Sequence, residues 1–461
     1  MRDLFFLAIA FILIFMALRR PFVGLALWLW SGLFVPVFWL YGIASGISYN
    51  TLFAALTGIS YLFASNKPQP TFNLQVALSI LLFLITTISS ATTIVIPELV
   101  WIEWDKFFKV MILFFATTLI LRKKSHFDLY IWAILLSIGF YAVIEGLKFI
   151  ASGGGHKIHG PYGHILADNN HLAISTAMIL PFFVYQIGNK WPPWLRIGLI
   201  AALCISILAV LGTHSRGGFI ALLVVGGYFW LKSNRKLLSI VGFSLMLGIA
   251  VNYLPDNWYS RMSTIETATQ DGSFMSRVVS WKIHTLMAMD RPLLGGGFKS
   301  ASYGYVWRAL SADLDRFSFF PTPPPGERGW AAHSIYFQVL GDHGFVALFL
   351  YLAILAGSYF RLGTIEKTVK KRHGIEHWHY RLARMTKLSL VTFAAGGASV
   401  SLPYYELYWA IIGMSAALTT AVKLDEVAEG NKGTNSAESD KPLRRRRTSN
   451  GIYTRQDLSD T

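Results

Sequence analysis

The stretch RIGLIAALCISILAVLGTHSRGGFIALLVVGGYFWLK, residues 196–232, determines the fold class. No residue between Arg196 and His214 is charged, and none between Arg216 and Lys232. Each of these apolar runs approaches the roughly 20 residues that an α-helix needs to cross a bilayer. Because a helix satisfies its backbone polar groups internally, two such runs joined by a short polar turn predict a transmembrane helical hairpin.

Similar apolar runs recur along most of the 461 residues, of which 54% are hydrophobic and 14% charged. A soluble protein would carry roughly 25% charged residues. The composition therefore predicts an all-α polytopic membrane protein with about 12 or 13 transmembrane helices. The expected spans are about 4–18, 22–46, 48–65, 73–95, 106–121, 127–150, 168–188, 196–213, 217–231, 238–254, 334–360, 386–402 and 405–422.

The positive charge of the chain predicts orientation rather than nucleic-acid binding. Much of the net charge of +16 lies in loops between apolar runs, at 122–124, 232–236 and 361–387. Such clusters are typical of cytoplasmic loops. With these loops inside, residues 151–167, 212–217 and 255–333 face the opposite side.

This topology divides the chain into regions of different character. Residues 1–150 are N-terminal helices, 151–254 are central helices with His/Gly-rich and Ser-Arg-Gly loops, and 334–422 are C-terminal helices. The segment 255–333 is a large extracytoplasmic loop domain, in which we expect amphipathic helices such as Ser276 to Met289. Residues 423–461 read as a disordered cytoplasmic tail.

The first candidate site is His214-Ser215-Arg216-Gly217-Gly218, at the outer junction of two spans. A guanidinium at this level can hold a phosphate through paired donors. The two glycines allow the backbone to approach a bulky headgroup. The alternative is an interfacial arginine that anchors a helix end.

The second candidate site surrounds Arg277 in the large loop. Arg277 and Trp281 are four residues apart, so a helix would place them on one face. Arg291 precedes Gly295-Gly296-Gly297, which we expect to turn sharply or to expose backbone N–H groups. The spacing does not fit a Walker loop. The alternative for Arg277 is a surface salt bridge.

The third candidate site is His333-Ser334, directly before a strongly apolar run. The positive end of a helix dipole would keep this imidazole neutral. A neutral imidazole is the form that a general base needs. A structural role at a helix end is the alternative.

The loop 156–171 contains four histidines and Asp168, but their spacing fits no zinc pattern. We therefore expect no metal here, and no role is assigned to His156, His159 or His164. Asp168 and Asn169 are expected to line a cavity at the start of the next span. Glu145 and Glu406 lie in or next to apolar runs, where a carboxylate is costly, and their roles also stay open.

Together these residues resemble the O-antigen ligase and polymerase superfamily. The shared pattern is Ser215-Arg216-Gly217, then Arg277, then the glycine run, then His333-Ser334, over roughly residues 195–360. The N-terminal half is similar to the O-glycosylation ligases associated with the exosortase A system. That similarity rests on Leu18-Arg19-Arg20-Pro21, Gly153-Gly154-Gly155 and Asp168-Asn169-Asn170.

The resemblance implies a GT-C-like fold in the bacterial inner membrane, with the active site facing the periplasm. It implies that Arg216 and Arg277, with Ser215 and Gly217, bind the diphosphate of an undecaprenyl-diphosphate-linked glycan. His333 would be the catalytic base for the acceptor hydroxyl, and Asp168, Asn169 and Arg291 would contact the acceptor or line the cavity. Transfer would be inverting and would need neither a metal nor a cofactor.

The acceptor stays open between lipid A core, a protein Ser/Thr and an exopolysaccharide chain. A polymerase that joins repeat units on the lipid carrier would have the same residues. A transporter of lipid-linked oligosaccharides is a further alternative, although transporters tend to place charges at the midplane and to show inverted repeats. A membrane scaffold is disfavoured, because it would not need arginines and a histidine gathered on one side. A membrane protease is disfavoured, because no protease motif is present.

Overall fold

All regular structure is helical in the part of the chain that the structure describes. The computed structural model describes residues 2–65, 67–237, 248 and 272–439, and within them there is no strand. The prediction of an all-α protein is therefore confirmed. The α-helices are α1 (Arg2–Arg19), α2 (Pro21–Phe34), α3 (Gly42–Ser45), α4 (Tyr49–Leu62), α5 (Leu74–Ala91), α6 (Pro97–Ile120), α7 (Lys124–Leu135), α8 (Ile138–Ala151), α9 (Asn169–Ile187), α10 (Pro193–Gly212), α11 (Arg216–Lys232), α14 (Gly272–Asp290), α15 (Gly304–Ser311), α16 (Ile335–His373), α17 (Trp378–Gly397) and α18 (Glu406–Ser439). The short 3₁₀ helices are η1 (Pro36–Trp39), η2 (Ile165–Ala167), η4 (Ser300–Ser302) and η5 (Leu314–Phe317).

The chain is a polytopic membrane protein, as its composition predicts. Among the described residues, six helical segments are long and apolar enough to cross a membrane, where the sequence predicts 12 or 13. The difference arises because other helices are shorter or more charged: α11 has 17 residues, and α6 begins with several acidic and basic side chains. The expected span 238–254 lies outside the described residues except for residue 248. The six segments are Leu74–Ala91, Lys124–Ala151, Asn169–Ile187, Pro193–Gly212, Ile335–His373 and Glu406–Glu429.

The prediction of one continuous span over 22–46 is wrong. α2 ends at Phe34, and Val35 adopts a left-handed φ of 47° before Pro36. Proline disfavours the helical conformation in the residue that precedes it. The chain therefore leaves the helix at this point and continues into η1 and α3.

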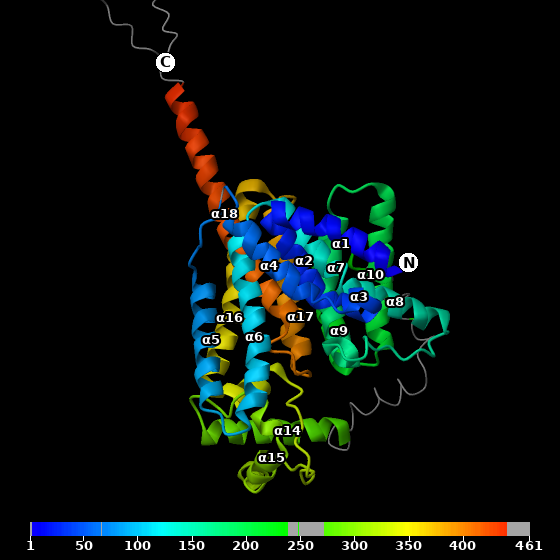
Figure 1. The fold of residues 1–461 in the computed structure, drawn as a ribbon, viewed down its shortest axis with the longest axis vertical. Helices are drawn as coiled ribbons and strands as arrows, with labels where there is room; N and C mark the ends of the chain where they lie inside the picture. The colour runs from blue at the N-terminus through cyan, green and yellow to red at the C-terminus, as the bar shows by residue number, and fades with distance from the viewer. Residues whose placement is uncertain (1, 66, 238–247, 249–271, 440–461) are drawn as a thin grey trace, which may run out of the picture.

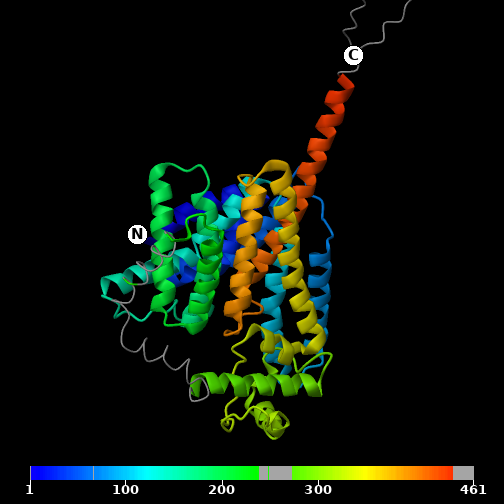
Figure 2. The ribbon, with the colours of Figure 1, turned by 180° about the vertical axis from the view of Figure 1, so that it is seen from behind.

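The long helices form a bundle with a layer of shorter helices across one end (Figures 1 and 2). α5 packs against both α6 and α16, while α17 packs against α16 and α9. α14 lies across the end of the bundle against α16, with α15 beyond it (Figures 1 and 2). The helix predicted at 276–289 is thus confirmed as part of α14.

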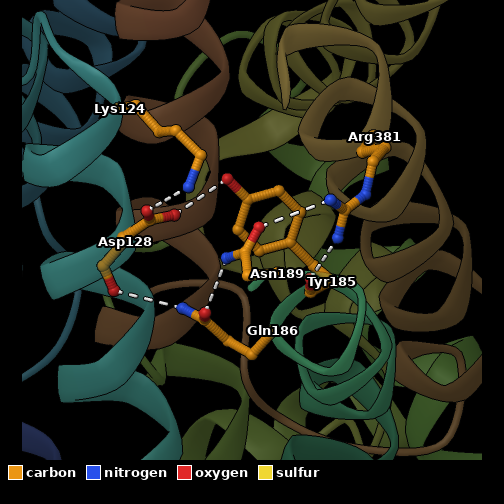
Figure 3. A network of polar contacts seen from close by, with 6 residues as sticks. All are labelled: Lys124, Asp128, Tyr185, Gln186, Asn189 and Arg381. Carbon is orange, nitrogen blue, oxygen red and sulfur yellow. Dashed lines mark hydrogen bonds and ion pairs between the residues drawn. The ribbon is translucent and has the colours of Figure 1, made fainter. Parts of the chain in front are cut away.

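A polar network joins α7, α9 and α17 (Figure 3). It includes Arg381 at the start of α17, which lies at the end of the bundle away from α14 (Figures 1 and 2). The Tyr185 hydroxyl donates to Asp128 Oδ1 at 2.9 Å, and Asp128 also forms an ion pair with Lys124. Arg381 donates to the Tyr185 carbonyl at 2.6 Å and to Asn189 Oδ1 at 3.4 Å. The basic loops 122–124 and 361–387 are therefore held together at the end of the bundle away from α14.

The last helix is longer than the sequence predicts. α18 continues to Ser439, so residues 423–439 are helical where a disordered tail is expected from residue 423. The start of this extension is stabilised by α16, because Arg372 pairs with Glu426 at 2.6 Å. Residues 440–461 of the expected tail lie outside the described residues.

Candidate functional site

The Ser-Arg-Gly turn is fixed to the start of α9. The Ser215 hydroxyl caps α11 by accepting the backbone N–H three residues on, at 3.1 Å, and donates to Asn170 Oδ1 at 2.8 Å. Asn169 Nδ2 donates to the Thr213 carbonyl at 2.7 Å. Asn169 therefore positions this turn, and Arg216 begins α11 immediately after it.

Gly217 brings the same turn against the segment between α17 and α18. A Cβ at this position would lie 1.9 Å from Ser399 Oγ, so the approach requires glycine. Two residues further on, Ser401 Oγ accepts the backbone N–H of His333 at 3.0 Å. The segment 399–401 thus connects the Ser-Arg-Gly turn to His333.

His333 is held in an unusual backbone conformation by contacts with α14. Its φ of 46° lies in the left-handed region, which residues other than glycine seldom occupy. Ser280 Oγ donates to the Ala331 carbonyl at 2.9 Å, and Trp281 Nε1 donates to the Ala332 carbonyl at 2.8 Å. These bonds fix the two residues before His333, so α14 determines where the imidazole lies.

The imidazole of His333 lies among charged groups of two other elements. Burial and the positive charge of Arg277 lower its pKa, and His171 adds to this effect, while the carboxylate of Asp168 raises the pKa. The net pKa is lowered, so the ring is neutral at physiological pH and can accept a proton. Three residues that the sequence selects, Asp168, Arg277 and His333, are therefore brought together by the fold.

A cavity of about 520 Å³ lies beside this group. Ala331, Ala332 and Ser401, which flank or bind His333, form part of its wall. This volume lies within the roughly 300–1,000 Å³ that is typical of small-molecule sites. Further polar residues of the wall come from distant parts of the chain: Glu103, Lys106, His171, His284, Lys299, Gln338, Asp342, Tyr404 and Glu406.

Two lysines of the cavity wall share one carboxylate. Glu103 Oε1 lies 2.8 Å from Lys106 Nζ and 2.9 Å from Lys299 Nζ. The sequence does not identify these residues as a site, because they belong to α6 and to the loop after α14 and meet only in the folded chain. One sequence feature does point to Glu103 and Lys106: they belong to a group of charged side chains next to the apolar run 106–121. Charged residues next to or within a membrane span seldom lack a role.

His284 is a further cavity residue that the sequence does not single out. It is buried in α14, and burial lowers the pKa of its imidazole to about 4. Its Nδ1 lies 2.8 Å from the Ser280 carbonyl, which is an acceptor, so the proton of the neutral ring is on Nδ1. A Cβ on Gly341 would lie 2.7 Å from the His284 ring, so glycine makes room for it.

The glycine run packs onto a kink of α16. Gly296 N–H donates to the Gly341 carbonyl and Gly297 N–H to the Asp342 carbonyl, at 3.1 and 2.8 Å. A Cβ on Gly295 would lie 2.6 Å from the Asp342 carbonyl oxygen. The expected sharp turn is present. The alternative expectation, that the backbone N–H groups are exposed, does not hold for these two groups, because they donate to carbonyls of α16.

The remaining sequence candidates lie in other surroundings. Arg291, beyond the far end of α14, donates to the Thr92 carbonyl at 2.9 Å. His156 Nε2 lies 2.7 Å from Glu145 Oε2, and His164 Nδ1 accepts a backbone N–H at 3.1 Å. His159 is exposed. Within the described residues, no group of three or more His, Cys, Asp or Glu side chains could hold a metal ion.

Two family models match the chain. Residues 172–352 match the O-antigen ligase family, and residues 1–188 match a family of unknown function, DUF5935. No curated protein matches the chain. The first match contains the Ser-Arg-Gly turn, α14 and His333, so the resemblance to O-antigen ligases is confirmed for the region that holds the site.

Proposed function

We propose that this chain is a glycosyltransferase of the O-antigen ligase type, which moves a glycan from undecaprenyl diphosphate to an acceptor hydroxyl. The observation that carries the proposal is the meeting of Arg277, Asp168 and His333 beside a cavity with charged side chains in its wall. These residues come from the Asp168–Asn170 turn, α14 and the start of α16, and the last two lie within the O-antigen ligase match. A base next to a cation is what attack on a phosphate-activated sugar requires.

His333 accepts the proton of the acceptor hydroxyl in this proposal. As the proton moves to the neutral imidazole, the acceptor oxygen forms a bond to the anomeric carbon of the glycan. The bond between that carbon and the diphosphate oxygen breaks, and its electron pair leaves with the diphosphate. Attack from the face opposite to the leaving group inverts the anomeric configuration.

Arg277 and Arg216 hold the diphosphate as its negative charge grows. Ser215 and Gly217 fix the turn that carries Arg216, through the contacts with Asn170 and Ser399. The N-terminus of α16 adds to this field, because its preceding residue makes no side-chain cap and helix N-termini attract anions. Guanidinium groups neutralise the leaving group directly, so we expect metal-independent transfer.

We place the site at the periplasmic face of the bacterial inner membrane, in a GT-C-like arrangement. The basic loops at the other end of the bundle support this orientation. The N-terminal similarity to exosortase-associated ligases favours a protein hydroxyl or an exopolysaccharide chain as acceptor over lipid A core. Asp168 lies close enough to His333 to act on its charge, so it also borders the position of the acceptor.

The test is transfer by the purified chain in detergent, in the presence of EDTA. The donor is lipid-linked glycan extracted from the source cells, and lipid A core, Ser/Thr peptides and exopolysaccharide are offered as acceptors. We expect product from the wild type and a loss of about 100-fold or more in His333→Ala. His159→Ala, at an exposed histidine of another loop, is the matched control and should keep full activity.

Three other outcomes are informative. Product that consists of lengthened glycan on the lipid carrier would assign a polymerase. Transfer that EDTA abolishes would contradict metal independence. Absence of any product, together with movement of the lipid-linked glycan across liposomes by the wild type, would replace the proposal with a transporter.

A further inference from the structure

A second cavity adjoins the first on the side of the N-terminal helices. Its volume is about 350 Å³, and it lies between α2, α4, α6 and the first residue of α18. The two cavities share Gly32, Lys106, Val110 and Glu406 in their walls, so they meet at these residues. Apart from Glu406, the wall of the second cavity lies within residues 1–188, the part of the chain that matches the family of unknown function.

Glu406 stands at the junction of the two cavities. A Cβ on Gly32 would lie 2.3 Å from both carboxylate oxygens of Glu406 and 2.6 Å from Asn50 Nδ2, so glycine makes room for both groups. Among the residues that the structure describes, none forms a hydrogen bond or an ion pair with this carboxylate. A half-buried carboxylate without a partner is costly, so a ligand hydroxyl there would lower its free energy.

The charges of the second cavity favour a neutral polar ligand over a phosphate. Its two lysines are already paired, Lys106 with Glu103 at 2.8 Å and Lys109 with Asp105 at 2.5 Å. Binding of a phosphate to these lysines would require the ion pairs to break, whereas a neutral ligand leaves them intact. A sugar hydroxyl therefore fits the second cavity better than the diphosphate does.

We propose that the second cavity is a subsite for a sugar unit, whose hydroxyl groups bind Glu406 and Asn50. The carboxylate accepts from hydroxyls, and the Asn50 amide both donates and accepts. The wall also includes Trp28 and Ser31, and the Ser31 hydroxyl donates to the Trp28 carbonyl at 2.9 Å. The inference rests on the proposed glycosyl transfer, and the sugar belongs either to the donor glycan or to a glycan acceptor.

Gly32→Ala tests the subsite by filling the junction without changing a charge. Gly58→Ala is the matched control, because Gly58 lies on neighbouring α4 and a Cβ there would meet nothing within 4 Å. Glu406→Gln is a second variant, which keeps the volume and replaces the carboxyl group with an amide. Binding to the purified full chain is measured with three probes: extracted lipid-linked glycan, undecaprenyl diphosphate without sugar, and the glycan released by mild acid.

We expect both variants to weaken binding of a sugar-bearing probe by about tenfold or more, as for the loss of one hydrogen bond to a charged group. Binding of undecaprenyl diphosphate should stay unchanged, as should all binding by Gly58→Ala. An effect confined to the lipid-linked glycan assigns the donor sugar, and an effect on the released glycan assigns the acceptor.

The subsite is refuted if both variants bind all three probes as the wild type does, or if undecaprenyl diphosphate is weakened equally. Failure of the proposed function is a separate result, because there the wild type itself transfers no glycan. Wild-type transfer together with unaltered glycan binding in the variants overturns this inference alone.

Discussion

Two substitutions near His333 should shift the pKa of the same imidazole in opposite directions. Arg277 lowers this pKa and Asp168 raises it. Because His333 must be neutral to accept a proton, kcat/KM falls as the pH decreases through its pKa. Arg277→Gln raises the pKa and moves this acidic limb to higher pH. Asp168→Asn lowers the pKa and moves the limb to lower pH.

The two variants should also differ in rate at the pH plateau. In the proposed mechanism, Arg277→Gln removes a contact to the leaving diphosphate, which would cost on the order of 100-fold, or about 3 kcal/mol of transition-state stabilisation. Asp168→Asn should preserve the fold, because Asp168 caps α9 by accepting backbone N–H groups at 2.8 and 3.1 Å and asparagine caps helices equally well. Its plateau rate should therefore stay closer to that of the wild type.

Arg291→Gln is the control for the loss of one positive charge from the same region. Arg291 follows Arg277 by 14 residues, roughly 21 Å along a helix, whereas charges are screened over about 8 Å at physiological salt. Its acidic limb should coincide with that of the wild type. The assay is glycan transfer at constant ionic strength across the pH range. Coincident limbs in all four proteins, or shifts of the same sign in Arg277→Gln and Asp168→Asn, would refute His333 as the base.

Three further substitutions test how the structure positions the site. Gly344→Ala should destabilise the protein by about 1–3 kcal/mol, because Gly344 has a φ of 78° and a Cβ there would lie 2.5 Å from a backbone carbonyl. Gly357→Ala, in the same helix with open space around it, should leave the melting temperature in detergent unchanged. Trp281→Phe loses a hydrogen bond of about 1 kcal/mol to the segment before His333, and should lower kcat while the KM for lipid-linked glycan stays constant. Asp128→Asn, in the network at the far end of the bundle, should lower the melting temperature but not kcat, since only the ion pair is lost. A fall in kcat for Asp128→Asn at constant folded fraction would contradict the separation of the two ends.

The sequence predicts the position of a residue well where that residue stands at the end of an apolar run. Arg216 and His333 each lie at the boundary between a polar loop and a long helix, so their level in the membrane follows from hydropathy alone. Arg277 follows from helical spacing, because α14 places it one turn from Trp281. The position of each of these residues within its own helix or loop therefore follows from the local sequence. Only their proximity to one another depends on packing.

The cavity wall could not be predicted in this way, because it depends on contacts between distant segments. Lys106 and Lys299 are almost two hundred positions apart and share Glu103 only after α6 has packed near the loop that follows α14. The sequence also leaves open whether the glycine run turns sharply or exposes its backbone N–H groups, and the answer depends on the packing of Gly295 against the backbone of Asp342. Pro36 does indicate that a helix ends near Val35, but the length of the surrounding apolar run favoured the prediction of one continuous span.

The division of the site between the two matched regions has a consequence for specificity. Arg277 and His333 lie in the part similar to O-antigen ligases, whereas Gly32 and Lys106 lie in the part that matches the family of unknown function. α9 belongs largely to both matches, and its first turn carries His171, which acts on His333 and lines the cavity. In the proposed mechanism, substitutions in the wall of the second cavity would therefore change which glycan is bound while His333, Arg216 and Arg277 stay in place. In such an arrangement a relative could acquire a new substrate without altering the chemistry of transfer.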